Sequence, residues 1–300
     1  MSTAGAAPTG PILTLVDGQP AVGVDVLDRG LHYGDGLFET IACRAGRARF
    51  LDLHLQRLRE GCERLSFHYA DFSSLAQQIR ELAARQPACI IKLILTRGSA
   101  TARGYGARGD ERARCVLLQY RWDAPDPLPW ERGVAVRTAR GRLGENPALA
   151  GLKHTNRLEQ VLIRGEWSDP GIQEALIYSS SGWLVSGTMS NVFVVKQGQI
   201  MTPALTSAGI RGVMRRVVMD VARGGGLEVS QIAVDAASLA AAEEIFLTNA
   251  LIGIWPVRAL DGRSLTVGPV TRQLQQWLLP LLNAPASAAA DGPAEDPGHA

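Results

Sequence analysis

Lys153 is one of very few lysines in a chain of 300 residues, which raises the question of what a lysine alone can do there. The only others are Lys92 and Lys196, so 28 of the 31 Lys and Arg residues are arginine. Arginine stays protonated near neutral pH, whereas lysine can lose its proton and attack a carbonyl carbon. A biased composition would also leave few lysines, so rarity alone does not assign a role.

The residues that follow Lys153 place it beside a helix. Asn156 precedes Glu159 by three positions, which is the spacing of a capping box, so the sequence predicts a helix that begins near Asn156. Lys153 would then lie just before that helix, at the edge of a sheet. Partial burial there disfavours the ammonium form and would bring the lysine pKa down from about 10.4 toward neutrality.

Three further features have residue types that could line a binding site, two of them for a phosphate group. Gly209 and Gly212 flank the start of a helical pattern, where backbone N–H groups and the helix dipole favour an anion. An apolar strand ends at Thr248, and Arg57 lies on a predicted helix. Each feature also has an ordinary explanation, because helix starts often contain glycine, strands often end in plain turns, and helical arginines are often solvated.

Hydrophobic periodicity predicts a mixed chain of helices and strands in two parts. Asp-Gly at 17–18 predicts a hairpin between strands 12–16 and 21–26. Helices are predicted over 52–67, 73–85, 210–223 and 268–282, and further strands over 89–96, 115–120, 133–138, 174–178, 183–185, 192–196, 227–234, 244–248 and 252–258. The proline-rich segment 124–129 predicts a linker between a small domain, 11–123, and a larger one, 130–283, and the composition of 1–10 and 284–300 predicts disordered tails.

Composition and charge narrow the function classes. The formal net charge is +2 and the arginines are scattered, which argues against a nucleic-acid partner. The four cysteines are far apart and form no CxxC pair, so they predict neither a metal site nor a disulfide framework, and they fit a reducing compartment. No apolar run has transmembrane length and the first residues do not resemble a signal peptide, so we expect a cytoplasmic protein.

Longer motifs in the chain resemble a known enzyme family. Asp28-Arg-Gly-Leu-His-Tyr-Gly-Asp-Gly-Leu-Phe-Glu-Thr40 resembles the opening motif of the fold-type IV pyridoxal-phosphate enzymes, which include D-amino-acid and branched-chain aminotransferases. Residues 141–164, around Lys153, are similar to the branch of that family that cleaves aminodeoxychorismate. The resemblance covers roughly residues 12–282 and implies an α+β fold of two domains, a small N-terminal α/β sandwich and a larger sheet-rich pseudo-barrel that binds the cofactor.

The resemblance also implies roles for single residues. Lys153 would bind pyridoxal 5'-phosphate covalently through its amine and then move the substrate proton, and Thr40 would donate a proton to the leaving group. The residues implied to hold the cofactor, chiefly its phosphate, are Arg57, Ile210, Arg211, Gly212 and Thr248. Those implied to contact the substrate and its carboxylates are Arg97, Arg103, Tyr105 and Asn249, each of which could instead be a structural hydrogen-bonding group.

One position departs from the family pattern. Ser186 stands where the family carries a glutamate that pairs with the pyridine nitrogen of the cofactor. A carboxylate keeps that nitrogen protonated and makes the ring a strong electron sink, whereas a hydroxyl can only hydrogen-bond to it. Transamination needs the strong sink, but loss of pyruvate is helped because the product ring becomes aromatic. We therefore expect Ser186 to favour elimination, unless an acid from elsewhere in the fold replaces the glutamate.

Together the motifs favour a lyase that converts 4-amino-4-deoxychorismate into p-aminobenzoate and pyruvate for folate synthesis. The alternative in the same fold is a D-amino-acid or branched-chain aminotransferase. A scaffold protein without turnover is a third possibility, and the retention of Lys153, Arg57 and the glycines of the predicted phosphate site argues against it. Family members are homodimers, so the resemblance implies a homodimer with a small-molecule substrate and with neither a nucleic-acid nor a membrane partner.

Overall fold

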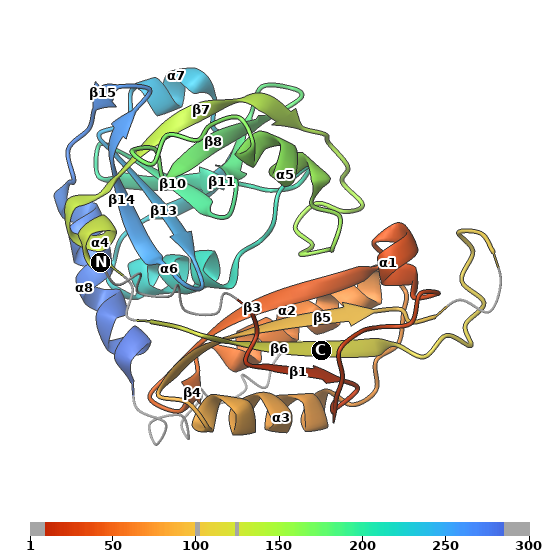
Figure 1. Ribbon diagram of the computed structural model, residues 1–300. Helices are drawn as coiled ribbons and strands as arrows, with labels where there is room; N and C mark the ends of the chain where they lie inside the picture. The colour runs from red at the N-terminus through yellow and green to blue at the C-terminus, as the bar shows by residue number, and fades with distance from the viewer. Residues whose placement is uncertain (1–9, 100–102, 124–125, 285–300) are drawn as a thin grey trace, which may run out of the picture.

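The computed structural model describes residues 10–99, 103–123 and 126–284, which form a small and a large domain (Figure 1). The small domain is built on a six-stranded antiparallel sheet with the strand order β2-β1-β6-β5-β3-β4. Its elements are β1 (Leu13–Val16), β2 (Gln19–Pro20), α1 (Arg29–Tyr33), β3 (Gly36–Arg44), β4 (Arg47–Ala48), α2 (Leu51–Arg64), α3 (Phe72–Ala84), β5 (Ala88–Thr96) and β6 (Arg114–Arg121).

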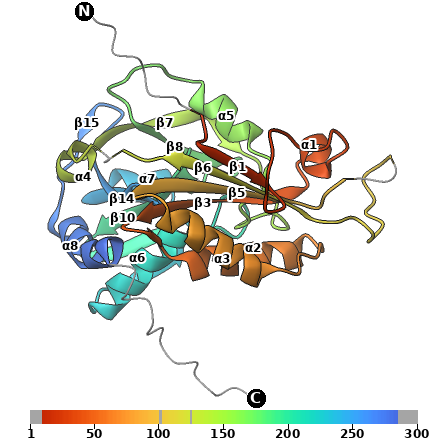
Figure 2. The same ribbon diagram turned by 60° about the horizontal axis from the view of Figure 1, so that its bottom comes forward.

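Helices α2 and α3 cover one face of this sheet (Figure 2). Ile41 and Ile91 occupy paired positions of β3 and β5, and they share one core with Leu58 of α2 and Ile79 of α3. All four side chains are almost completely buried. Because side chains alternate along a strand, Phe38 of β3 faces away from these helices.

The large domain contains a nine-stranded mixed sheet that curls into a half-barrel. Eight strands follow the order β12-β11-β10-β13-β14-β7-β8-β9, and β15 pairs with β14. The elements are α4 (Leu128–Arg132), β7 (Val134–Leu143), α5 (Leu158–Arg164), β8 (Glu174–Ser179), β9 (Leu184–Gly187), β10 (Asn191–Lys196), β11 (Gln199–Pro203), α6 (Val213–Gly224), β12 (Val229–Ile232), α7 (Ala236–Ala240), β13 (Glu244–Asn249), β14 (Gly253–Leu260), β15 (Arg263–Ser264) and α8 (Pro269–Asn283).

The curl brings the end strand β9 back against β10 and β11, so the sheet nearly closes. The N–H of Leu184 in β9 donates to the carbonyl of Val234 at 2.8 Å, and this hydrogen bond stabilises the curled sheet. Leu176, Val192 and Leu247 fill the interior of the curl. Helices α6 and α8 pack on its outside through a second core, and α5 packs through a third. Strands of this domain read as continuous apolar runs because both of their faces are covered.

Most of the predicted elements are confirmed, with shifts of a few residues at their ends, but strand 21–26 is wrong. β2 comprises only Gln19–Pro20, because proline cannot donate to a ladder and Val22 and Val24 beyond it are exposed. The predicted linker is also shorter than expected. Its second half enters α4, whose first turn accepts Pro129, while residues 124–125 lie outside the described part. β3, β11 and the short α1, α4, α7, β4 and β15 were not predicted.

The tails predicted over 1–10 and 284–300 lie outside the described residues, apart from Gly10 and Ala284. Among the described helices, none is long and apolar enough to cross a membrane. Within the same residues, no group of three or more His, Cys, Asp or Glu side chains could hold a metal ion.

Candidate active site

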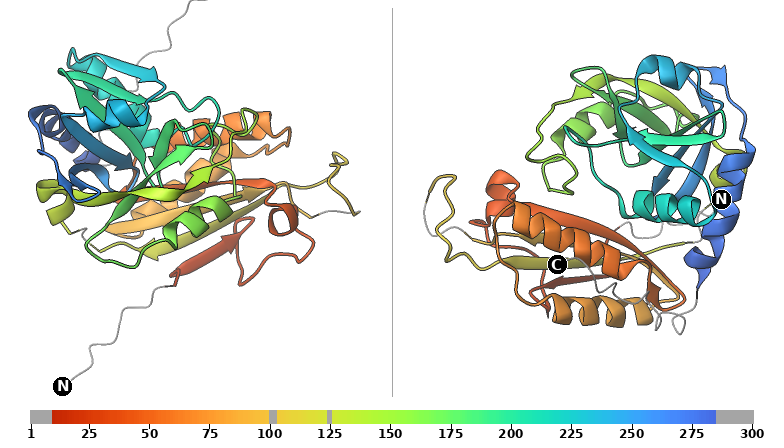
Figure 3. Two further views of the ribbon diagram at one scale, coloured as in Figure 1. Left: turned by 90° about the horizontal axis from the view of Figure 1, so that it is seen from above. Right: turned by 180° about the vertical axis from the view of Figure 1, so that it is seen from behind.

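Lys153 lies where the two domains are joined by backbone hydrogen bonds. The chain between β7 and α5 leaves the large domain and reaches the small domain beside α1 and β3 (Figure 1, Figure 3). The N–H of Phe38 donates to the carbonyl of Lys153 at 2.9 Å, and the N–H of Thr155 donates to the carbonyl of Gly36 at 2.9 Å. The segment carrying the lysine is therefore an extra strand-like partner of β3.

The helix after Lys153 begins later than predicted, at Leu158, and its first turn has no side-chain cap. The amide of Asn156 instead donates to the carbonyl of Gly34 at 2.9 Å, which ties the lysine segment to the end of α1. Glu159 accepts from the N–H of Gly144 at 2.8 Å. Both residues of the expected capping box thus fix loops around Lys153 rather than the helix end.

The side chain of Lys153 is shielded and lies over an aromatic ring. Its Nζ is 4.1 Å from the centre of the Phe38 ring. Burial, followed by the positive charge of Arg57, lowers the pKa of Lys153 from 10.5 to about 7; Glu39 opposes this effect, and Arg157 adds to it. An amine with such a pKa is substantially neutral at physiological pH, which is the form that attacks a carbonyl.

A buried carboxylate organises the basic side chains next to the lysine. Glu39 of β3 receives Arg57 Nε at 2.7 Å, a second bond from Arg57 Nη2, and His54 Nδ1 at 2.6 Å. The charges of Arg57 and His54 overcome the opposing effect of burial and lower the pKa of Glu39 to about 2. Burial lowers the pKa of His54, and its Nε2 is buried without a partner among the described residues. Glu39 therefore stays ionised and holds the Arg57 guanidinium in one orientation.

Arg57 reaches across to the start of α6 in the large domain. Its Nη1 donates to the carbonyl of Arg211 at 3.0 Å. Gly212 is the N-cap of α6, no side chain caps this end, and the first turn contains no acidic residue. The segment is fixed in place because Asn191 donates to the carbonyl of Ile210 at 2.8 Å. Free helix N–H groups facing a guanidinium form a site that suits a phosphate group.

The phosphate cradle and the lysine are linked through the backbone. Gly151, two residues before Lys153, forms a bridge with Ile210, and the N–H of Arg211 donates to the carbonyl of Gly151 at 3.1 Å. Thr248 is fully buried opposite Asn191 in the sheet, and its hydroxyl donates to the carbonyl of Gly253 at 2.6 Å. The structure thus brings the predicted residues Arg57, Ile210, Arg211, Gly212 and Thr248 to one region.

Ser186 is buried on β9, and its hydroxyl donates to the carbonyl of Gly187 at 2.8 Å. The nearest buried acid on the paired strand is Glu174, which is fully engaged elsewhere. It accepts from the N–H and hydroxyl of Thr188, from the N–H of Met189 and from the hydroxyl of Ser190. Glu174 therefore holds the turn after β9 and has little capacity left to replace the glutamate that the family pattern places at position 186.

The four residues predicted to contact substrate lie in different surroundings. The Arg97 guanidinium donates to both oxygens of Asp35 and to the carbonyls of Leu65 and Ser66. The amide of Asn249 donates to the carbonyl of Met189, and its oxygen accepts two N–H groups in the turn before β14. Both residues have structural partners that account for their presence.

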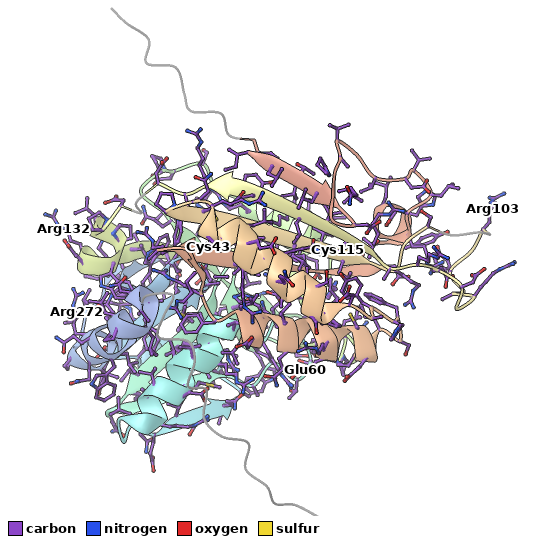
Figure 4. All side chains as sticks on the ribbon, turned by 90° about the horizontal axis from the view of Figure 1, so that it is seen from below. Cys43, Glu60, Arg103, Cys115, Arg132 and Arg272 are labelled. Carbon is purple, nitrogen blue, oxygen red and sulfur yellow. The ribbon has the colours of Figure 1, made fainter. Side chains whose placement is uncertain are left out.

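The other two substrate candidates lie on the loop between β5 and β6. Arg103 is exposed at the outer end of this loop, away from the body of the molecule (Figure 4). Tyr105 is 85% exposed, with its ring edge against Tyr33 at a centroid distance of 5.2 Å. Tyr33 in turn lines a cavity of about 240 Å³ together with Gly34, His154 and Asn156, which borders the lysine segment. Thr40 lies on β3 two positions beyond Phe38 and on the same face.

Sequence reasoning missed the residues that support the site rather than form it. Glu39, His54, Asn191 and Arg157 were not assigned roles, although each contacts or electrostatically affects a predicted site residue. A signal for His54 existed, because His54 and Arg57 are three residues apart on α2 and so share one helix face. The partner carboxylate on β3 could be identified only from the fold.

The fold and the half-buried lysine near the uncapped start of α6 fit a pyridoxal-phosphate enzyme of fold type IV. The chain belongs to the Amino-transferase class IV family, which it matches over residues 36–260. The predicted family, fold class and cofactor are thereby confirmed.

The proteins that this chain resembles include both aminodeoxychorismate lyases and aminotransferases. The solved 4-amino-4-deoxychorismate lyase of Pseudomonas aeruginosa is 45% identical, with a TM-score of 0.85 over 89% of this chain and 98% of that chain. Aminodeoxychorismate lyase of Vibrio harveyi is 31% identical over 265 residues, which are 87% of this chain and 97% of that protein. The branched-chain amino acid aminotransferase of Escherichia coli, at 24% identity and a TM-score of 0.80 over 89% of this chain and 93% of that chain, shares the fold alone.

Proposed function

We propose that this chain is a pyridoxal-phosphate-dependent lyase that cleaves 4-amino-4-deoxychorismate into p-aminobenzoate and pyruvate. The observation that carries the proposal is the 45% identity to the Pseudomonas aeruginosa lyase over nearly the full length of both chains. Two features of the site support it: the shielded amine of Lys153 and the presence of Ser186 in place of a carboxylate.

The residues present fit the cofactor. The uncapped N-terminus of α6 and the guanidinium of Arg57 would hold its phosphate, and the Nζ of Lys153 would hold its aldehyde carbon. Pyridoxal phosphate, when bound, withdraws electrons from the carbon that bears the substrate amine. Glu39 already fixes the orientation of Arg57, so cofactor binding would cost little further side-chain entropy at this residue.

Lys153 is suited to move the substrate proton once the substrate amine has displaced it. With a pKa of about 7, its Nζ can accept a proton from the amine-bearing carbon and release it again near neutral pH. Phe38 shields this amine from water on one side. Thr40, on the same face of β3 as Phe38, would donate a proton to the departing enolpyruvate through its hydroxyl.

Ser186 supports elimination rather than transamination. Its hydroxyl supplies no negative charge, and Glu174 is committed to the turn that follows β9. Without a carboxylate, the pyridine nitrogen is not held in its protonated form. Elimination is the less demanding of the two reactions, since the product ring becomes aromatic.

A homodimer is part of this proposal. Leu158, Val161 and Leu162 of α5 are 64% to 70% exposed, and together they form an apolar face next to the lysine segment. Such a face on a helix is typical of a surface that a partner covers. We also retain a reducing, cytoplasmic setting as a proposal, which the four buried free cysteines support.

The test supplies purified, cofactor-loaded protein with freshly prepared aminodeoxychorismate and quantifies p-aminobenzoate and pyruvate. Equimolar release by the wild type, abolished in Lys153→Ala and retained in Lys196→Ala, is the expected result. The second variant is a matched control, because Lys196 is an exposed lysine at the end of β10. Conversion of a D- or branched-chain amino acid to its keto acid, without pyruvate release from aminodeoxychorismate, would instead support the aminotransferase alternative.

A further inference from the structure

A second basic site lies at the far end of β3 from Lys153. We call it the arginine–tryptophan cluster, and it consists of Arg44, Arg47, Arg49 and Trp122. The cluster surrounds the turn between β3 and β4, near the last turn of α8 (Figure 1). Arg44 is six residues along β3 from Phe38, so the cluster is about 20 Å from the lysine.

The four side chains converge from separate segments. Arg44 and Arg47 are directly paired across the β3–β4 ladder. The guanidinium carbons of Arg44 and Arg49 lie 4.5 and 5.6 Å from the centre of the Trp122 ring. Arg47 donates from Nη2 to the carbonyl of Leu281 at 2.8 Å, which anchors the cluster to α8. Two cations thus lie against one aromatic ring, and a third lies beside them on β4.

The positive charge of the cluster has no counterion among the described residues. None of the three arginines forms an ion pair there, and Arg49, only 6% exposed, donates no side-chain hydrogen bond to a described residue. Arg44 Nη2, Arg47 Nε and Arg49 Nε are buried without partners in the same part of the chain. Burial, followed by the charges of Arg44 and Arg47, lowers the pKa of Arg49 to about 10.

This arrangement differs from the other buried arginines near the sheet. Arg29 pairs with Asp35, and Arg57 pairs with Glu39. A buried charge without a partner is strongly unfavourable, and stacking on an aromatic ring offsets only part of that cost. An anion bound here would balance the buried charge of Arg49 and the charges of its two partly exposed neighbours.

We propose that the arginine–tryptophan cluster binds a small oxyanion, a phosphate or a carboxylate, at a site separate from the cofactor phosphate. Arg44 and Arg47 are partly exposed and give access from solvent, while Arg49 lies beneath them. Guanidinium groups offer planar pairs of donors that match phosphate and carboxylate oxygens. Trp122 forms one side of the site and serves as a fluorescent reporter.

The experiment titrates holoenzyme at low ionic strength with inorganic phosphate and, in a parallel arm, with succinate. Cofactor loading keeps the Arg57 site filled, so that added phosphate reports on the second site alone. Calorimetry and tryptophan fluorescence follow binding to the wild type, to Arg44→Gln combined with Arg47→Gln, and to Arg80→Gln. Arg80 is a matched control, because it is an exposed arginine of α3 that pairs only loosely with Asp52.

The expected result is one saturable site per chain for at least one of the two anions, at least tenfold weaker in the double variant and unchanged in Arg80→Gln. The arm that binds more tightly identifies the source of the oxyanion. Trp122→Phe should remove the fluorescence change and retain calorimetric binding. Arg49→Met should not lower the melting temperature measured without added anion, because it removes an unbalanced buried charge.

Two results would overturn the proposal. One is that neither anion binds the wild type more tightly than the double variant. The other is that Arg49→Met lowers the melting temperature strongly in anion-free buffer, because that would mean a carboxylate of the protein, from this chain or a second copy, already balances the cluster. The cofactor-dependent activity enters neither measurement, so failure here is distinct from failure of the proposed lyase function.

Discussion

Replacement of Glu39 by glutamine separates the charge of this carboxylate from its shape. The variant keeps a hydrogen-bonding side chain on β3 but removes the only negative charge that Arg57 and His54 contact there. Since Glu39 is buried, the Arg57 guanidinium would lose a counterion that water cannot replace. We expect a large loss of stability and a weaker phosphate site.

The magnitude follows from the environment of the carboxylate. Its partners lower the pKa of Glu39 from 4.5 to about 2, which corresponds to about 3 kcal/mol of stabilisation of the charged form. Because the folded-state pKa lies below the unfolded value, this stabilisation is fully present above about pH 5 and is lost as the pH falls toward 2. Glu39→Gln should therefore cost about 3 kcal/mol at pH 7, and progressively less below pH 5.

Urea unfolding of the apoprotein at pH 7 and at pH 4 measures this difference. Glu63→Gln provides the control, because Glu63 is an exposed acid near the end of α2. The free energy of unfolding of the control should change by less than about 0.5 kcal/mol. If Glu39→Gln were as stable as the control at pH 7, or if its deficit did not shrink at pH 4, the role assigned to this carboxylate would be wrong.

Three further perturbations address the lysine, the turn beside it and the serine. Lys153→Met should stabilise the apoprotein by up to about 5 kcal/mol below pH 7, because the folded-state pKa of about 7 penalises the ammonium form. The gain should shrink as the pH rises toward 10.5, and urea midpoints at pH 6 and pH 9 check this. Gly34→Ala should lower the free energy of unfolding by about 1–3 kcal/mol, since Gly34 has φ 64° and the new methyl group would clash with the Asn156 amide that holds the lysine segment. It should also weaken cofactor binding, measured by absorbance titration. A variant with unchanged affinity would argue against that link. Ser186→Glu should slow the lyase reaction and introduce transamination of a D- or branched-chain amino acid, which keto acid formation measures. An unchanged lyase rate with no transamination would remove the support for our interpretation of Ser186.

Local patterns in the sequence were sufficient to predict most of the elements and the reactive group. β5, β6 and β10 are apolar runs of strand length, and α2 and α3 have helical spacing of their buried residues, so each could be recognised alone. Lys153 could be singled out by its rarity and by the motif around it. These features depend on neighbours that lie a few positions away.

The parts of the site that could not be predicted depend on distant neighbours. Asn156 and Glu159 have capping-box spacing, but the fold brings Gly34 and Gly144 to their side chains, and these partners prevail over the local preference. The sequence suggested Arg97 as a ligand of a substrate carboxylate, but it did not indicate that Arg97 also donates to Asp35. No spacing rule indicates which acid will meet which arginine when the two lie far apart in the chain.

The small domain contributes side chains that surround Lys153. Phe38 shields the amine of Lys153, and Glu39 raises the pKa of that amine. Arg57 donates to the carbonyl of Arg211 at the start of α6. The lysine itself belongs to the large domain, and its segment is held by hydrogen bonds to β3. The pKa that makes the amine reactive is therefore a property of the assembled pair of domains. It follows that a change at their junction should alter the chemistry of Lys153 even where no residue that touches the cofactor has been replaced.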